Sequence, residues 1–130
     1  MLTRDTTAGV LNEDGRYLVA QRKKGGPLSE KWEFIGGKNR YGETLQDTLK
    51  REWMEEVGLK ISVGEFLLNT EFDNNDTHYT LHCYRVYSVS ESTELSLSVH
   101  NDVRWVTREE LSSLDFGPSD GVIRDFLLSL

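Results

Sequence analysis

Three glutamates on one predicted helix are the residues whose spacing points most directly to chemistry. Glu52, Glu55 and Glu56 fall in a segment with helical periodicity, residues 44–57, and Gly58 follows at a position typical of a helix C-terminus. The apolar stripe of this helix consists of Leu45, Leu49, Trp53 and Val57. At about 100° per residue, Glu52 and Glu56 share a face beside this stripe, and Glu55 lies one step around. The three carboxylates are therefore expected at the margin of a core.

These carboxylates need a positive partner, because like charges at i and i+4 on a helix destabilise it, and more so when they are partly buried. Arg51 can pair with one of them. A divalent metal suits the others, because Mg²⁺ takes oxygen ligands and is commonly held by one or two carboxylates together with substrate phosphates. A solvated acidic helix with local ion pairs is the alternative explanation of the same residues.

The residues before the helix favour the metal site over the solvated helix. Gly36 and Gly37 carry no side chains, so the backbone can approach whatever the helix holds. A carbonyl there could complete a metal site, and Lys38 could meet a phosphate.

The elements that must position these residues are predicted from periodicity and turn signals. Strands are expected over residues 6–11, 16–22, 32–34, 77–89 and 103–106, with one or two more within 60–72. Asp14-Gly15 is typical of a hairpin turn, and residues 23–31 form a polar loop broken by glycine and proline. Thr107 and Glu110 form a capping box before a short helix, and residues 119–129 form the last helix. This order predicts an α/β protein with a mixed sheet covered by helices.

Length and composition predict one domain over residues 1–130. Twenty-two acidic residues against fifteen basic ones give a net charge of −7, which argues against nucleic-acid polymers and anionic membranes as partners. The single cysteine, Cys83, is expected in a buried strand position and excludes a disulfide within the chain. No apolar run approaches a membrane span of about 20 residues, and residues 1–5 lack a signal-peptide core. We therefore expect a cytoplasmic protein, monomeric or homodimeric.

Gly37, Glu43 and the run 51–59 together resemble the Nudix box, G-x5-E-x7-R-E-U-x-E-E-x-G-U, where U is a bulky aliphatic residue. The box spans residues 37–59. Trp53 in the first U position is larger than usual, so the helix is expected to sit further from the sheet. Residues 32–38, W-E-F-I-G-G-K, are similar to the W-E-F-P-G-G-K segment of the MutT-type subgroup. Its late pattern R-W-V…E-L…F-x-P-A-[N/D] resembles residues 104–106, 110–111 and 116–120.

The resemblance implies the Nudix fold, an α/β/α sandwich around a mixed sheet. It also implies hydrolysis, dependent on Mg²⁺ or Mn²⁺, of nucleoside diphosphates linked to another group. By matching position, Glu52 and Glu56 would ligate the metal with the Gly36 carbonyl, and Glu55 would bind a further metal directly or through water. Glu52 would also orient or deprotonate the attacking water.

The same resemblance implies that Arg51 holds Glu52 by a charge-assisted contact. Glu43 would brace the loop through Arg51, although simple acidity at a helix N-terminus, favoured by the helix dipole, is the alternative.

Four residues are expected to face the substrate. Arg22 aligns with an arginine near the nucleotide, with a surface role at a strand end as the alternative, and Lys38 would contact phosphate. Phe34 would form part of the base pocket or simply pack in the core. Asp120 stands where the subgroup reads the base edge, and a first-turn helix acid is the alternative. An ionised Asp only accepts hydrogen bonds, whereas a protonated one also donates, so cytosine, adenine, guanine and oxidised purines all suit it.

Some MutT-type enzymes use another acid in a late loop, and Val99 stands in its place here. Asp102 is a candidate replacement, but the change points to Glu52 as the base. The three histidines show no metal-ligand spacing with cysteine, and His78 and His82 are interpreted as structural or solvent-facing strand residues.

The leading hypothesis is hydrolysis of a nucleoside triphosphate, an oxidised purine deoxynucleotide or a CTP-like substrate, to the monophosphate and pyrophosphate. A nucleotide sugar is the second hypothesis; it is disfavoured because such enzymes often carry extra N-terminal strands and this sequence begins almost at the fold. A non-catalytic module that binds metal or nucleotide is the third, disfavoured by the retained box glutamates.

Overall fold

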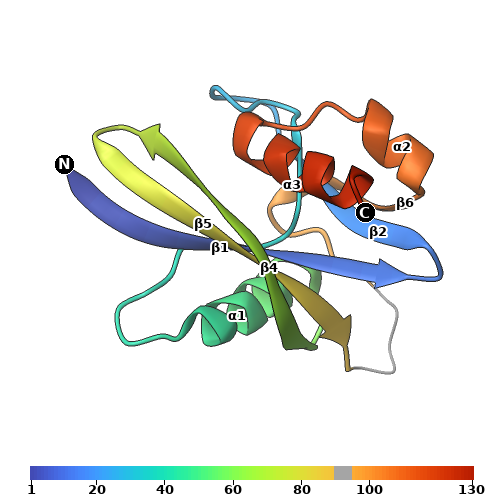
Figure 1. The fold of residues 1–130 in the computed structure, drawn as a ribbon, viewed down its shortest axis with the longest axis horizontal. Helices are drawn as coiled ribbons and strands as arrows, with labels where there is room; N and C mark the ends of the chain where they lie inside the picture. The colour runs from blue at the N-terminus through green and yellow to red at the C-terminus, as the bar shows by residue number, and fades with distance from the viewer. Residues whose placement is uncertain (90–94) are drawn as a thin grey trace.

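The described residues form a mixed sheet covered by helices, as the sequence predicts (Figure 1). The structure is a computed structural model that describes residues 1–89 and 95–130. Its elements are β1 (Leu2–Glu13), β2 (Arg16–Arg22), β3 (Trp32–Glu33), α1 (Leu45–Val57), β4 (Ile61–Asn74), β5 (Thr77–Ser88), β6 (His100–Val106), α2 (Arg108–Ser113) and α3 (Pro118–Leu128). Among the described residues, none of the helices has the length and apolar character needed to span a membrane.

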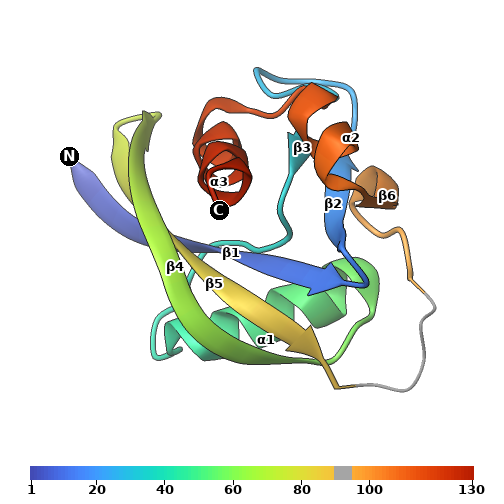
Figure 2. The same cartoon turned by 45° about the vertical axis from the view of Figure 1, so that its right-hand side comes forward.

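The sheet is built around β1 and β2. β1 pairs in parallel with β5 over ten residues, and β5 pairs antiparallel with β4. β1 and β2 form the predicted hairpin, in which Asn12 lies opposite Tyr17. β2 in turn pairs antiparallel with β3 and with β6, so strands from both ends of the chain meet beside it (Figure 2). The sheet therefore carries both parallel and antiparallel pairs, and the predicted mixed sheet is confirmed.

Helices cover both faces of this sheet, with α1 on one face and α3 on the other (Figure 2). Successive strand residues point to opposite faces, and β1 and β2 supply both cores accordingly. Val10 and Val19 belong to the cluster on the α2–α3 side, whereas Leu11 and Leu18 belong to the cluster on the α1 side. The α/β/α arrangement is thereby confirmed.

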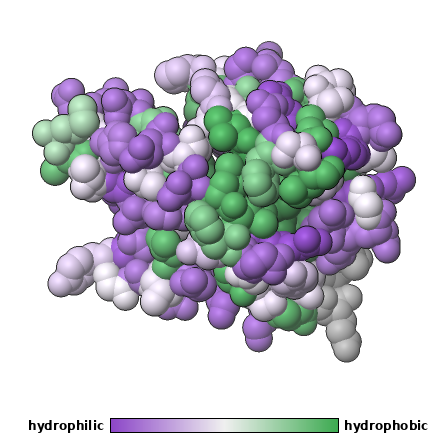
Figure 3. All heavy atoms as spheres, in the orientation of Figure 1, coloured by the Kyte–Doolittle hydropathy of each residue, from purple (hydrophilic) through white to green (hydrophobic). Residues whose placement is uncertain are grey.

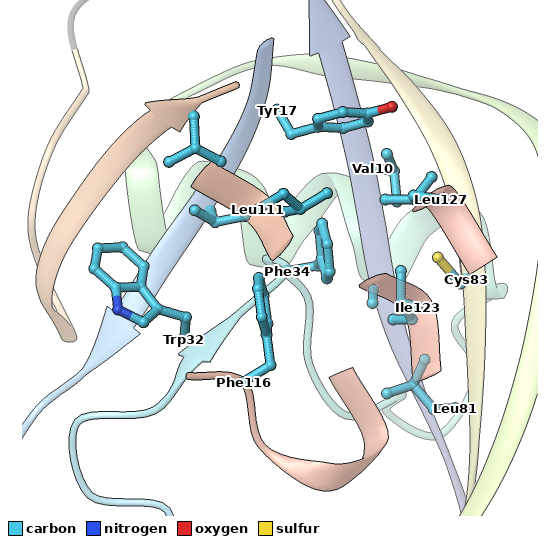
Figure 4. Packing of buried hydrophobic residues seen from close by; sticks show 13 residues of the cluster. Val10, Tyr17, Trp32, Phe34, Leu81, Cys83, Leu111, Phe116, Ile123 and Leu127 are labelled. Atoms are coloured by element: carbon cyan, nitrogen blue, oxygen red, sulfur yellow. The ribbon is translucent and has the colours of Figure 1, made fainter. Parts of the chain in front are cut away.

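The cluster on the α2–α3 side is rich in aromatic residues (Figure 4). Phe34 and Phe116 stack with their ring centroids 5.3 Å apart, and Ile123 of α3 is fully buried in the same cluster. Cys83 of β5 is buried there as predicted, and burial raises the pKa of its thiol to about 12. This core fixes the start of α3 against the segment that follows β3.

Helix α1 is fixed at its ends and along its apolar face. The Thr44 hydroxyl accepts from the Asp47 N–H at the first turn, and Gly58 ends the helix in the left-handed conformation. Trp53 is fully buried, and its Nε1–H donates to the Ile35 carbonyl at 3.0 Å. Its bulk is accommodated by a missing side chain, because a Cβ on Gly9 of β1 would lie 2.7 Å from Nε1.

Two strand boundaries differ from the sequence prediction. The region expected to hold one or two strands within 60–72 forms one strand, β4, which continues to Asn74 with register irregularities near Phe66. β1 begins at Leu2, ahead of the predicted residue 6, because its first residues pair with β5. On α3, Val122 is 42% exposed. Apolar side chains gather over α3 and the middle of β4 on this face of the molecule (Figure 3).

Candidate active site

A cleft of about 940 Å³ brings most of the predicted site residues together. All six strands contribute to its lining, together with α1, the first turn of α3 and the loop over residues 23–28. The predicted residues that line it are Arg22, Phe34, Gly36, Lys38, Glu52, Glu55, Glu56 and Asp120. Arg51 and Glu43 do not line the cleft: Arg51 contacts its acidic residue Glu52, and Glu43 contacts Arg51.

The acidic edge of α1 forms one wall of the cleft. Glu55 is half exposed, Glu52 is largely buried, and Glu56 is only 8% exposed. Burial, followed by the nearby Glu52 carboxylate, raises the pKa of Glu56 to about 9. The Oε2 atom of Glu56 is buried and has no hydrogen-bond partner among the described residues. Buried polar atoms are nearly always partnered, so an orphaned carboxylate oxygen in a cleft indicates a ligand.

Arg51 organises this wall from behind. Its Nη1–H lies 2.9 Å from Glu52 Oε1 and 3.3 Å from Glu55 Oε2, and its Nη2–H donates to the Lys38 carbonyl at 3.1 Å. The two oxygens of Glu43 take Nε–H at 2.7 Å and Nη2–H at 3.0 Å. The pKa of Glu43 falls to about 2, mainly through the hydrogen bond from Arg51, and the pKa of Arg51 rises in return. The predicted brace between Glu43 and Arg51 is present.

The glycine segment approaches the helix closely, as its sequence suggests. A Cβ on Gly37 would lie 2.3 Å from the Glu52 carboxyl carbon, so any side chain there would displace that carboxylate. The carbonyls on either side of Gly36 are occupied: Ile35 accepts from Gly9 N–H, and Gly37 accepts from Thr7 N–H. The Gly36 carbonyl accepts no hydrogen bond from the described residues. It is therefore the one free to complete a metal site.

Arg22 and Lys38, the two cations expected to contact phosphate, both line the cleft. The Arg22 guanidinium donates to Glu33 Oε1 at 3.1 Å and remains about half exposed at the cleft. The Lys38 ammonium lies 5.4 Å from the centroid of the Tyr79 ring, which also lines the cleft. Both cations are therefore held in place while their charge faces the cleft.

The base-side residues Phe34 and Asp120 prove to be linked. Asp120 Oδ1 accepts the backbone N–H of Phe34 at 3.0 Å, which ties the first turn of α3 to the strand segment. Burial, followed by repulsion from Glu33, raises the pKa of Asp120 to about 7. Phe34 is 3% exposed, packs in the core and also lines the cleft.

Sequence reasoning missed two residues of the site, Glu33 and His100. His100 is 4% exposed, and its Nε2 lies 2.7 Å from Glu33 Oε2 and 3.6 Å from Glu56 Oε1. One ligand atom from each of these three residues lies within 4.8 Å of the others. The sequence signal that could have identified Glu33 was its place in the W-E-F segment. The position of His100 depends on sheet register, since β6 places it opposite Arg22 of β2.

The acidic edge fits a divalent cation. Its donors are carboxylate and carbonyl oxygens, which Mg²⁺ and Mn²⁺ prefer. The orphaned oxygen of Glu56 and the free carbonyl of Gly36 supply unused lone pairs. The close approach of Gly37 to Glu52 leaves no room for a competing side chain.

Comparison with known proteins agrees with this geometry. The family model described as the NUDIX domain matches residues 1–126. The chain belongs to the Nudix hydrolase family. A Mycobacterium tuberculosis protein named "Putative 8-oxo-dGTP diphosphatase 2" is 36% identical over 134 residues, covering 100% of this chain and 92% of the relative. The CTP pyrophosphohydrolase of Escherichia coli K12 is 27% identical over 126 residues, covering 97% and 92%.

Solved structures of other Nudix and MutT-type proteins share the fold. The solution structure of the E. coli ORF135 protein superposes with a TM-score of 0.86 at 26% identity, covering 100% of this chain and 91% of that one. The crystal structure of a MutT protein from Methanosarcina mazei Go1 gives a TM-score of 0.79 at 23% identity, covering 96% and 90%. The predicted membership of the Nudix family and its MutT-type fold are thus confirmed.

The late segment of this Nudix hydrolase departs from the subgroup pattern in the way the sequence suggests. Val99 lines the cleft where the extra acid was expected, and it is 54% exposed. Asp102, the candidate replacement, is not among the cleft residues and instead accepts from Arg104 at 2.7 Å. Among the described residues between 95 and 106, no carboxylate reaches the cleft.

Proposed function

We propose that this Nudix hydrolase converts a nucleoside triphosphate, an oxidised purine deoxynucleotide or a CTP-like molecule, to its monophosphate and pyrophosphate. The observation that carries the proposal is the acidic wall, where Glu52, Glu56 and the Gly36 carbonyl converge with an orphaned carboxylate oxygen. The names of the mycobacterial and E. coli relatives support these substrate classes.

Mg²⁺ or Mn²⁺ is the proposed cofactor. Glu52, Glu56 and the Gly36 carbonyl would hold it, and Glu55, half exposed at the rim, would reach a further ion directly or through water. When bound, the ion neutralises charge on the phosphoryl oxygens as water attacks phosphorus.

Glu52 is the proposed base. Its Oε1 is fixed by Arg51 at 2.9 Å, which orients the carboxylate and leaves its other oxygen available to the attacking water. Water oxygen forms the new bond to phosphorus, the P–O bond to the departing pyrophosphate breaks, and Glu52 takes the proton. Glu43 supports this step through Arg51, whose guanidinium it holds with both oxygens.

The proposed nucleotide contacts lie on the other walls. Arg22 and Lys38 would bind phosphate oxygens, and Phe34 would contribute an apolar wall beside the base. Asp120 uses Oδ1 for the Phe34 N–H, so Oδ2 remains to meet the base edge. A pKa of about 7 lets this carboxyl act as donor or acceptor near neutral pH, which suits both oxidised purines and cytosine.

A nucleotide panel tests the proposal. The wild type is assayed with 8-oxo-dGTP, dGTP, CTP, dCTP and UDP-glucose in Mg²⁺, scored by kcat/KM and by product identity. Pyrophosphate and monophosphate from 8-oxo-dGTP or a cytosine nucleotide are expected. Cleavage of UDP-glucose to two monophosphates would replace the proposed substrate class, and no cleavage of any compound would point to a binding module.

A further inference from the structure

His100 is a buried titratable group at the cleft that the proposed reaction does not use. It opens β6 directly opposite Arg22 of β2, at the point where the register of the two strands shifts. Its side chain is 3% exposed, whereas Glu33 is 16% and Arg22 is 48% exposed. The three side chains thus form a line that runs from the interior to the cleft.

Hydrogen bonds connect this line throughout. His100 Nε2 lies 2.7 Å from Glu33 Oε2, and Glu33 Oε1 lies 3.1 Å from Arg22 Nη1. Both oxygens of Glu33 are therefore engaged, one by a buried imidazole and one by the cation at the cleft. An arginine that is fixed in this way loses less conformational entropy when it binds an anion.

The surroundings of the second ring nitrogen of His100 indicate whether the imidazole donates a hydrogen bond or binds a metal. Nδ1 is buried and has no hydrogen-bond partner among the described residues. A buried N–H without a partner is rarer in proteins than a buried acceptor without one. The favoured tautomer therefore carries its proton on Nε2, and that nitrogen donates to Glu33.

This tautomer separates His100 from the metal. The Nε2 atom lies 3.6 Å from Glu56 Oε1, and the His100, Glu33 and Glu56 ligand atoms are close enough to hold an ion. Metal binding through Nε2 would move the proton to Nδ1, where no acceptor exists among the described residues. As a hydrogen-bond donor to Glu33, His100 leaves fewer buried polar atoms without a partner than it would as a metal ligand.

We propose that His100 is a positioning residue for nucleotide binding: its Nε2–H holds the Glu33 carboxylate, and Glu33 in turn holds the Arg22 guanidinium in the cleft. The proposal rests on the proposed function, because Arg22 is assigned there to the nucleotide. It adds that affinity for the triphosphate depends on His100 through Glu33 and Arg22.

A double-mutant cycle tests the connection to Arg22. Dissociation constants of the α,β-imido analogues of dGTP and dCTP are measured by calorimetry with Mg²⁺ for the wild type, Arg22→Met, His100→Leu and the double variant. His100→Leu is expected to weaken binding about tenfold in the wild-type background and not at all beside Arg22→Met. If the losses of affinity in the two single variants instead multiply in the double variant, the proposal is overturned.

Two further variants separate positioning from packing. His100→Gln keeps an N–H at the reach of Nε2 and is expected to bind within about twofold of the wild type; a loss equal to that of His100→Leu would contradict the donor role. His82→Leu is the matched control, because His82 makes a similar 2.8 Å contact to Asp5 away from the cleft. An equal loss in this control would show a general effect and overturn the proposal.

Nitrogen-15 spectra of the imidazole give a readout independent of nucleotide. The proton on Nε2 of His100 is expected to persist when Mg²⁺ is added, and its signal to shift in Glu33→Gln. Transfer of the proton to Nδ1 on metal addition would make His100 a ligand and refute positioning. If His100→Leu does not fold, the cycle is run with Glu33→Gln. Failure of the wild type to release pyrophosphate contradicts the proposed function alone.

Discussion

Two histidine–carboxylate clusters in this molecule use the same residue types with opposite results. Near the end of β4 and the start of β5, His78 lies 2.6 Å from Asp73, which reaches the cleft rim, and 3.1 Å from Glu71, and all three side chains are at least about one third exposed. At the cleft, His100 contacts Glu33 and Glu56, and all three are largely buried. We call these the outer cluster and the cleft cluster.

The clusters differ in how completely their polar atoms are satisfied. Both ring nitrogens of His78 have partners, and Asp73, followed by Glu71, raises the pKa of His78. The cleft cluster leaves His100 Nδ1 and Glu56 Oε2 without partners among the described residues. Exposed ion pairs contribute little to stability, and buried orphaned atoms demand an explanation. Composition alone would not have distinguished the two clusters; burial and unused lone pairs do.

The largest effect is expected for Glu52→Gln, at the wall beside the cleft cluster. Loss of a positioned base commonly lowers turnover by 10²–10⁴-fold, so kcat is expected to fall about a thousandfold. The melting temperature should change little, because Gln can still accept from Arg51. Steady-state kinetics check this, with Glu109→Gln on the exposed face of α2 as the matched control. A kcat near the wild-type value would remove Glu52 from the mechanism.

The second-largest effect is expected in the stabilisation of the folded protein by Mg²⁺, which should depend on the cleft cluster and not on the outer cluster. Mg²⁺ at a hundredfold its Kd stabilises a protein by about 2.7 kcal/mol when it binds only the folded state. Glu56→Gln is expected to lose most of that gain, whereas Glu71→Gln in the outer cluster keeps it. Urea unfolding with and without Mg²⁺ measures both. Equal gains in the two variants would place the ion elsewhere.

Asp120 gives a smaller effect that depends on pH. Its pKa of about 7 in the folded protein exceeds the ordinary value of 3.8, so the folded state holds a proton that the unfolded state releases. Stability is therefore expected to fall progressively as pH rises from about 4 to 7, because over this range the unfolded state has lost a proton that the folded state still holds. Asp120→Asn should flatten the slope, since an amide oxygen can still accept the Phe34 N–H. The free energy of unfolding is measured against pH by urea titration. Equal slopes for the wild type and Asp120→Asn would contradict this prediction.

The smallest effect is expected for His78→Gln in the outer cluster. Its partners are exposed and solvated, so removal of the imidazole costs little. The melting temperature is expected to stay within about 1 °C and nucleotide affinity to remain unchanged. Thermal unfolding and calorimetry beside His100→Leu test this, and a loss in both variants would erase the distinction between the clusters.

The sequence predicted the parts of the site that are local. The box fixes Glu52, Glu55 and Glu56 on one helix, and helical periodicity places them beside the core without any tertiary information. The hairpin and the capping box at Thr107 are equally local and were confirmed.

The parts that sequence reasoning missed depend on pairing between distant strands. His100 meets Glu33 only because β6 and β3 both pair with β2, and no spacing in the chain encodes that register. Asp102 looked suitable by position, yet its carboxylate is engaged by Arg104, which follows it on the same face of β6.

The contact between Gly9 and Trp53 means that the two positions constrain each other across 43 intervening positions of sequence. A methyl group at residue 9 would push the indole off the Ile35 carbonyl and shift the neighbouring peptide, including the carbonyl that faces the cleft. A smaller side chain at residue 53 would relieve that clash but leave a void under the helix. A substitution at either residue is therefore expected to be tolerated only with a compensating change at the other. Substitutions behind the wall of the cleft can thus impair the reaction in it.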